Sequence, residues 1–365
     1  MSRFALRRHI GGLLVAGFDG EQLPPELRSL AREFGLGGVI LFGRNIVEPA
    51  QVAALSYDVG RLVPGLPPWV SVDQEGGRVA RLKAPFTEWP PMATLGRSGD
   101  VTLAERFARA LAVELKAVGI SLDFAPVLDV HTNPKNPVIG DRALAEKAGE
   151  VARLGNAIIR AMQGEGIAAC GKHFPGHGDT SADSHLELPL VEQPPERLRE
   201  VEFKPFQAAI AANVASIMTA HVLVPALDDK RPATLSRRII TGLLRQELGF
   251  EGVIFSDDLE MKALATEHTV PSAAVLAIEA GCDGLLVCSG NHDLQSRTLE
   301  ALIHAVEEER LPLARVEDAL KRQQRAKERF LAVPAAARPA DEKALRQTLG
   351  TGEHHAIADQ MARFA

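Results

Sequence analysis

Short apolar runs alternate with amphipathic helical patterns along most of this chain, about eight times in all. Such alternation is typical of parallel strands joined by helical crossovers. Several runs are apolar throughout, as expected for strands that are covered on both faces. The predicted strands are Leu13–Ala16, Gly38–Phe42, Trp69–Asp73, Ser121–Pro126, Ile167–Gly171, Ala215–Ala220, Gly252–Ser256 and Gly284–Val287.

The segments between these runs carry helical signals. Apolar residues recur at helical spacing over Leu103–Val118 and again over Val151–Met162, and Gly119 follows the first stripe where a helix commonly ends. Ser236 is a candidate N-cap for a helix that ends at Gly249. Eight strands favour an α/β fold of the (β/α)8 TIM-barrel type. The alternation alone is also compatible with an open doubly wound sheet.

A chain of 365 residues could hold two domains, but a (β/α)8 barrel by itself takes about 250 residues or more. We predict a single catalytic barrel domain over residues 1–332, whose regularity the pattern leaves open. Val333–Ala340 is rich in Pro and Ala and is typical of a linker, and Asp341–Phe364 predicts one short helix. Residues 333–365 are therefore expected to be an extension of the barrel and not a second domain.

Composition excludes several kinds of partner. With 46% hydrophobic and 24% charged residues and a net charge of −6, the chain lacks the basic character of a nucleic-acid-binding protein. No run approaches the roughly 20 apolar residues that span a bilayer. The basic Met1–Arg8 and the apolar Ile10–Phe18 imitate a signal peptide, but two glycines interrupt the apolar run. A first buried strand explains that run equally well.

The three cysteines favour a reducing compartment. Cys170, Cys282 and Cys288 form no CxxC motif and lie in or beside apolar runs, where small buried thiols are common. We therefore expect a cytoplasmic protein without structural disulfides.

Polar residues gather where the predicted strands end. In barrels of this class, functional side chains come from the carboxyl ends of the strands and from the loops that follow. A single carboxylate at such a place is more often a helix cap or a loop anchor, but several on one rim indicate a site. The residues concerned are Asp73, Asp129, His131, Lys172, His173, His221, Asp257 and Asp258.

The segment Lys172–His185 is the densest of these, with three His, two Asp and one Lys around several glycines. Its length and glycines predict an active-site loop that acts as a mobile lid. Asp183 and His185 are two positions apart, so in extended backbone their side chains project to the same side. A carboxylate beside an imidazole favours the protonated ring, and such a pair suits general acid and base catalysis near neutral pH.

Asp257 follows the apolar run Val253–Ser256, which would direct its carboxylate into the mouth of the barrel. A carboxylate there can attack an anomeric carbon. Asp258 is expected to face away, since successive side chains alternate along a strand, and to cap the helix that follows.

Two other chemistries compete for these residues. His173, His177, Asp179, Asp183 and His185 include zinc ligand types, but their spacing matches no HExxH or similar motif, and a loop-shaping role for His177 and Asp179 is favoured. No metal or organic cofactor is therefore expected. Lys172 at a strand end could form a Schiff base in an aldolase. The adjacent His173 favours a hydrogen bond to substrate instead.

Taken together, several motifs resemble the bacterial β-N-acetylglucosaminidases of glycoside hydrolase family 3. The resemblance rests on Lys172–His185 and Ser256–Leu259, and it covers most of the chain from about Gly12 to Val287. Further motifs in the expected order are Gly38–Phe42 with Arg44-Asn45, Asp73–Arg78, Gly140–Arg142 and Thr219–Val222.

The resemblance implies a role for each matching position. Asp257 would be the nucleophile, His185 the acid/base and Asp183 its partner. The sugar below the scissile bond would be bound by Asp73, Arg81, Arg142, Lys172 and His173. The Asp–His pair departs from most glycosidases, which use two carboxylates.

The resemblance also implies a retaining exo-enzyme that removes terminal GlcNAc from GlcNAc–anhydro-muropeptides during peptidoglycan recycling. The expected partner is thus a small carbohydrate, with no nucleic acid and no membrane, and a monomer is expected. Three alternatives are a β-glycosidase of broader specificity, a phosphorylase, and a sugar-binding protein without turnover. The phosphorylase is considered because a His acid/base repels phosphate less than a carboxylate does.

Overall fold

All eight apolar runs form strands, and each strand pairs in parallel with the next until β8 closes on β1. The computed structural model describes residues 3–181, 184, 188–331 and 339–365. The prediction of a (β/α)8 barrel is confirmed, and the open-sheet alternative is wrong. The strands are β1 (Leu14–Ala16), β2 (Gly38–Leu41), β3 (Trp69–Val72), β4 (Leu122–Asp123), β5 (Ala168–Phe174), β6 (Ser216–Thr219), β7 (Val253–Asp258) and β8 (Gly284–Val287).

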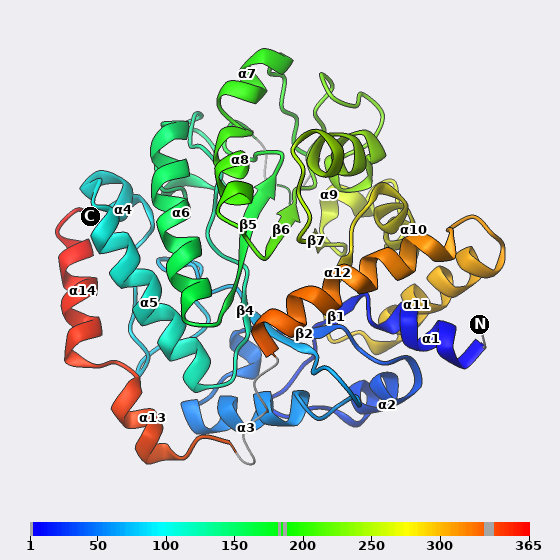
Figure 1. Cartoon of the computed structure of the whole chain (residues 1–365), viewed down its shortest axis with the longest axis horizontal. Helices are drawn as coiled ribbons and strands as arrows, with labels where there is room; N and C mark the ends of the chain where they lie inside the picture. Colours follow the sequence, from blue (N-terminus) through cyan, green and yellow to red (C-terminus); the bar gives the residue numbers. More distant parts are fainter. Residues whose placement is uncertain (1–2, 182–183, 185–187, 332–338) are drawn as a thin grey trace.

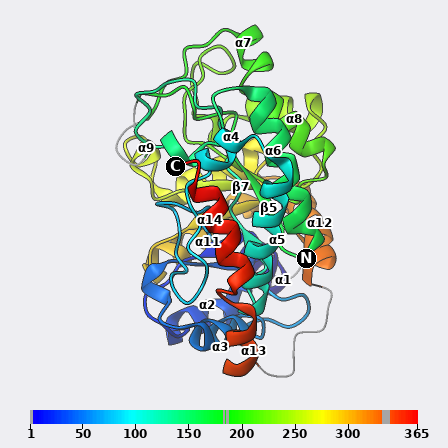
Figure 2. The ribbon, with the colours of Figure 1, turned by 90° about the vertical axis from the view of Figure 1, so that its left-hand side faces the viewer.

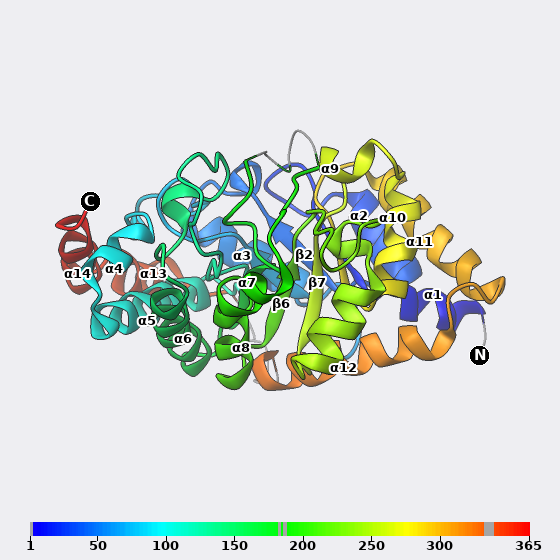
Figure 3. The same ribbon diagram turned by 90° about the horizontal axis from the view of Figure 1, so that it is seen from above.

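Helices surround the strands, as Figures 1 and 3 show from two directions. The α-helices of the described part are α1 (Arg3–Gly11), α2 (Pro25–Phe34), α3 (Pro49–Val59), α4 (Ala93–Ser98), α5 (Val101–Ala117), α6 (Ala148–Gly164), α7 (Pro195–Glu200), α8 (Lys204–Ala211), α9 (Lys262–Ala265), α10 (Val270–Ala280), α11 (His292–Glu307), α12 (Leu313–Leu331), α13 (Glu342–Thr348) and α14 (Gly352–Ala362). Shorter or wider turns are the 3-10 helices η1 (Gly43–Asn45), η2 (Gly140–Arg142) and η3 (Ala233–Leu235) and the π-helix η4 (Arg238–Glu247). None of the helices within these described ranges is both long and apolar enough to cross a bilayer.

The predicted helix signals are confirmed where the structure can test them. Asp100 caps α5 by accepting from the amides of Thr102 and Leu103, and Gly119 follows that helix with a φ of 78°. Ser236 Oγ accepts from the Ile239 amide at 3.2 Å near the start of η4. This segment is a π-helix, which the apolar spacing alone does not distinguish from an α-helix.

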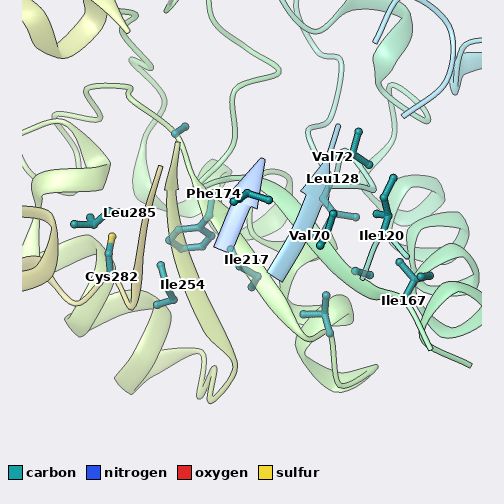
Figure 4. Packing of buried hydrophobic residues seen from close by; sticks show 14 of the residues in the cluster. Val70, Val72, Ile120, Leu128, Ile167, Phe174, Ile217, Ile254, Cys282 and Leu285 are labelled. Atoms are coloured by element: carbon teal, nitrogen blue, oxygen red, sulfur yellow. The ribbon is translucent and has the colours of Figure 1, made fainter. Parts of the chain in front are cut away.

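The apolar core has two layers, because successive strand residues face opposite sides of the sheet. Val15, Ile40 and Phe255 belong to the cluster inside the barrel. Their neighbours along the strands belong to the larger cluster between sheet and helices. Figure 4 shows this outer layer, in which Ile217 and Leu285 lie among the labelled apolar side chains.

Helix α12 covers the amino ends of the strands, opposite the predicted site (Figure 1). Gln323 Oε1 accepts from the Trp69 indole at 2.9 Å, and Lys327 Nζ donates to the Gly37 carbonyl at 2.7 Å. Phe330 packs against the cluster inside the barrel. The carboxyl ends of the strands are therefore the end at which a site can open.

The C-terminal extension corrects the prediction of a single helix over Asp341–Phe364. Two helices, α13 and α14, are separated at Gly350, whose φ is 55°, and α14 lies along α5 (Figure 2). The buried Glu114 of α5 accepts from the Gly350 amide at 2.9 Å and from His354 Nδ1 at 2.7 Å. The expected domain boundary at 332/333 lies outside the described residues and stays a prediction.

Candidate active site

A cavity of about 200 Å³ opens at the carboxyl ends of the strands. It is smaller than the roughly 300–1,000 Å³ typical of pockets for drug-sized ligands, and so suits a ligand of about one sugar ring. All five side chains predicted to bind the sugar line it together with Asp257. Its polar lining consists of Asp73, Glu75, Arg81, Arg142, Lys172, His173, His177, Ser184, Asp257 and Asp258.

A larger hollow of about 800 Å³ lies between η4, α10 and α12, on the side of the barrel where β7 and β8 begin. Its arginines are largely used in holding the fold. Arg245 and Arg315 both pair with the buried Asp283, and Arg315 and Arg322 pair with Asp318. The smaller cavity contains the predicted chemistry, so size alone does not locate the site.

One wall of the cavity is a charged cluster built around Lys172. Lys172 Nζ lies 2.7 Å from Asp73 Oδ1 and 2.7 Å from Glu75 Oε1. Arg142 binds Glu75 with two nitrogens, Nε to Oε2 at 2.9 Å and an Nη to Oε1 at 2.8 Å. Arg81 approaches Asp73 only to 3.6 Å. Lys172 lies inside β5 and not after it, because this strand runs three residues further than predicted.

These contacts hold Glu75 and Lys172 in their charged forms. Burial alone would raise the pKa of Glu75, but Lys172 and Arg142 outweigh it and keep that pKa well below its usual range. Burial alone would lower the pKa of Lys172, but Asp73 and Glu75 raise it above its usual value. A permanently protonated Lys172 is unsuited to Schiff-base chemistry, which requires the free amine.

Asp129 organises the start of the loop that follows β5. One of its oxygens accepts from His173 Nδ1 at 2.7 Å, and the other accepts from the His177 amide at 2.7 Å. Burial alone would raise the pKa of Asp129, but the two imidazoles and these bonds lower it. The partnership fixes which nitrogen of His173 is available to the cavity, namely Nε2.

The described part of the loop is hydrogen-bonded within itself, and the mobile lid stays a prediction. His177 Nδ1 lies 2.7 Å from Thr180 Oγ1, and its Nε2 lies 3.1 Å from Ser184 Oγ. Burial lowers the pKa of His177 to about 4, so the ring is neutral at pH 7. A Cβ added to Gly178 would lie 1.8 Å from the Val130 carbonyl oxygen, so only glycine fits there.

Asp257 lines the same cavity as the charged cluster, near the end of β7. Burial alone would raise its pKa, but the neighbouring His221 and His173 outweigh this and hold the pKa of Asp257 below its usual value. Its Oδ1 accepts from the Asp258 amide at 2.8 Å. The carboxylate is therefore ionised at neutral pH and faces a cavity of sugar size.

The expectation for Asp258 is wrong. The pairing of β7 with β8 shifts between Phe255 and Asp258, and this irregularity breaks the alternation on which the expectation rested. Both aspartates consequently line the cavity. Asp258 does not cap α9, which begins after Met261 without a side-chain cap.

Sequence reasoning missed two buried carboxyl groups. Glu75 binds both Lys172 and Arg142, and its only signal is that it lies two positions after Asp73 beyond the same strand. Asp123 of β4 accepts from the Gln74 amide at 2.9 Å, and burial raises its pKa well above the usual value.

The predicted acid/base pair, Asp183 and His185, lies outside the described residues. Among the residues that are described, no group of three or more His, Cys, Asp and Glu side chains is arranged to hold a metal ion. The nitrogens of His177 are already engaged within the protein.

Comparison with known proteins decides the family. The model of the glycosyl hydrolase family 3 N terminal domain matches residues 5–326. This chain belongs to glycoside hydrolase family 3. The beta-hexosaminidase of Thiobacillus denitrificans is 40% identical to it over 284 residues, which are 76% of this chain and 78% of the relative. That of Pseudomonas aeruginosa PAO1 is 41% identical over 279 residues, 76% of this chain and 82% of the relative.

Solved structures of family 3 members agree with this assignment. A β-N-acetylglucosaminidase from Paenibacillus sp. FPU-7 superposes with a TM-score of 0.94 at 42% identity, over 98% of this chain and 68% of that one. NagZ from Neisseria gonorrhoeae has a TM-score of 0.78 at 32% identity, over 97% and 98% of the two chains. The family 3 chain is thus a β-hexosaminidase-type glycoside hydrolase, and it acts on a carbohydrate.

Proposed function

We propose that this family 3 enzyme is a retaining exo-β-N-acetylglucosaminidase in which Asp257 is the nucleophile. The observation that carries the proposal is the placement of Asp257, whose ionised carboxylate lines a cavity of about 200 Å³ that is also lined by the charged cluster. A small cavity for about one ring suits removal of a single terminal sugar. The structures from Paenibacillus and Neisseria, described as a β-N-acetylglucosaminidase and as NagZ, support the same substrate class.

The charged cluster would bind and orient that sugar. Lys172 stays protonated between Asp73 and Glu75, so it can donate to a hydroxyl group at any physiological pH. Arg81 has a long contact to Asp73 and packs over the Phe42 ring, and within the described residues its buried Nε has no hydrogen-bond partner, so the guanidinium can donate to an acceptor on the ligand. Arg142 and His173 complete the set. Charge-assisted hydrogen bonds are roughly twice as strong as neutral ones, which suits selection among similar sugars.

The proposed reaction is a double displacement. Asp257 attacks C1 of the sugar while the bond from C1 to the leaving oxygen breaks, and protonated His185 gives its proton to that oxygen. Neutral His185 then takes a proton from water as the water oxygen attacks C1, and Asp257 leaves as a carboxylate. Asp183 would orient the imidazole and favour its protonated form before the first step.

For the natural substrate we propose GlcNAc linked to an anhydro-muropeptide, used by a cytoplasmic, monomeric enzyme of peptidoglycan recycling. Support comes from the match of nearly the whole chain to NagZ of Neisseria gonorrhoeae, 98% of which is covered. A muropeptide assay beside aryl β-GlcNAc tests this choice of aglycone directly.

The decisive experiment measures hydrolysis of 4-nitrophenyl β-GlcNAc and of the matching β-glucoside by the wild type, Asp257→Ala and His185→Ala. Asp58→Ala is the control, since Asp58 is an exposed surface carboxylate paired with Arg28. We expect at least a 1,000-fold loss of kcat for Asp257→Ala, on the scale of a lost nucleophile, and no change in the control. Wild-type activity in Asp257→Ala would refute the assigned role.

Proton NMR of the first sugar formed tests the stereochemistry. The β anomer is expected, since double displacement retains configuration. An α anomer would exclude the covalent route. Repeating the assay with phosphate distinguishes hydrolysis, which releases free GlcNAc, from phosphorolysis, which releases a sugar 1-phosphate.

A further inference from the structure

Asp258 contributes a second carboxyl group to the wall of the sugar cavity. The irregular pairing of β7 with β8 between Phe255 and Asp258 places it there beside Asp257. Bulges near active sites commonly redirect a side chain in this way. The proposed mechanism assigns this carboxyl group no role.

The two oxygens of the Asp258 carboxyl group have different surroundings. Oδ1 accepts from the Glu260 amide at 3.1 Å and from the Cys288 amide at 3.3 Å. Within the described ranges, Oδ2 has no hydrogen-bond partner from the protein. Since both amides are fixed donors, a proton on this group belongs on Oδ2, the oxygen that remains for a ligand.

The charges that face Asp258 favour such a proton. Burial is the largest cause, and together with the carboxylates of Glu260 and Asp257 it outweighs the hydrogen bonds from the Glu260 and Cys288 amides and raises the pKa of Asp258 to about 7. Among the other elements packed here, β8 is followed by Cys288, a buried thiol whose pKa is itself raised, and His221 follows β6. His221 Nε2 donates to the Asp258 carbonyl oxygen at 2.9 Å and not to its carboxyl group.

We propose that Asp258 binds the sugar as a protonated carboxyl group, donating a hydrogen bond from Oδ2 to an acceptor oxygen of the ligand. The inference rests on the proposed function, since it assumes that the cavity holds GlcNAc. Ionisation would remove the donor and set a second carboxylate beside Asp257, so the affinity for sugar falls as pH rises through neutrality. Asp258 thereby makes substrate binding, and not only proton transfer, dependent on pH.

Calorimetric titration of the wild type with the product GlcNAc, from pH 5.5 to 8.5, tests the proposal without requiring turnover. The dissociation constant should be constant in acid and should rise by up to roughly tenfold per pH unit above 7, because only the protonated form binds. Asp258→Asn mimics the protonated group, with an amide N–H in place of Oδ2–H and a carbonyl that still accepts from both amides. This variant should bind within about threefold of the wild type at pH 6 and should lose the pH dependence.

Asp58→Asn is the control, because it removes one exposed carboxylate that does not line the sugar cavity, and it should retain the wild-type pH profile. The KM for the aryl substrate should follow the same pattern, while kcat keeps its own pH dependence in both variants. The inference would be overturned if the wild-type affinity did not change across this pH range, or if Asp258→Asn showed the same pH profile as the wild type. Either result would leave the role proposed for Asp257 unaffected. Absence of GlcNAc binding at every pH would instead overturn the proposed function and the inference together.

Discussion

The replacement Glu75→Gln tests whether the charged cluster that lines the cavity is one interdependent unit. The Glu75 side chain is 1% exposed and carries the negative charge that balances Lys172 and Arg142. Gln keeps its shape but removes that charge, and loss of one partner from a buried pair costs about 3–5 kcal/mol. Because Lys172 still pairs with Asp73 in this variant, we expect a loss of unfolding free energy at the low end of that range, ~3 kcal/mol. With about 2.1 cal/mol/K of unfolding entropy per residue, that lowers Tm by roughly 4 °C for a chain of this length.

The assay is scanning calorimetry at pH 7 and pH 3, with Glu150→Gln as the control. Glu150 pairs with Arg153 at the surface, where the two side chains are 41% and 42% exposed, so less than about 0.5 kcal/mol should be lost. Lys172 and Arg142 hold the pKa of Glu75 below its usual value against the effect of burial. Its stabilisation is therefore complete above the unfolded pKa near 4.3 and shrinks as pH falls below it. A loss of Tm equal to the control's, or one as large at pH 3 as at pH 7, would refute the reasoning.

Three further variants test other parts of the molecule. Burial lowers the pKa of Lys327 to about 7, below its unfolded value near 10.4, so wild-type stability should rise between pH 7 and 10. Lys327→Met, which gives up the bond to the Gly37 carbonyl and the contact of Nζ with the Trp69 ring, should be about 1–3 kcal/mol more stable in urea at pH 6.5 and should lose that advantage by pH 10; a destabilised variant would contradict this. Gly178→Ala sets a Cβ 1.8 Å from the Val130 oxygen, so kcat/KM for aryl β-GlcNAc should fall at least tenfold. An unchanged kcat/KM would show that the loop moves to accommodate the added methyl group. Glu114→Leu leaves the Gly350 amide and His354, the donors that anchor α14, without their acceptor. The free energy of unfolding should fall by about 2–4 kcal/mol, and proteolysis of residues 339–365 should be faster. Wild-type resistance to proteolysis would show that α14 is held by its apolar face alone.

The barrel could be predicted because its signals are local. Each strand is a short apolar run, and features such as Gly119, with a φ of 78°, mark the helix ends within a few residues. The extension after Leu331 was harder, because a break at Gly350 depends on what lies beside it. Glu114, which lies 236 residues earlier in the sequence, accepts a hydrogen bond from the Gly350 amide. The apolar periodicity of α13 and α14 does not predict that contact.

The site was predicted by position, and its electrostatics were not. Asp73, Lys172 and Asp257 were expected on one rim because strand ends converge there, and the structure brings them to one cavity. Glu75 was not predicted because its role depends on two buried cations, Lys172 and Arg142. These cations come from β5 and η2, which lie far from Glu75 in the sequence. A buried charge is explained by its partners, and partners from distant segments are known only once the chain is folded.

Asp258 shows how a correct local rule can fail at a functional place. Alternation along a strand predicts that two successive aspartates face opposite sides, and it holds along β7 as far as Phe255, which lies inside the barrel. The shift in pairing that follows places both carboxyl groups at the cavity and so sets a second acid beside Asp257. Two carboxylates so close raise one another's proton affinity, and the pair separates into Asp257, with its pKa lowered, and Asp258, with its pKa near 7. An irregularity of a single residue in β7 thus sets the proposed nucleophile, which is ionised, beside a second carboxyl group that can hold a proton.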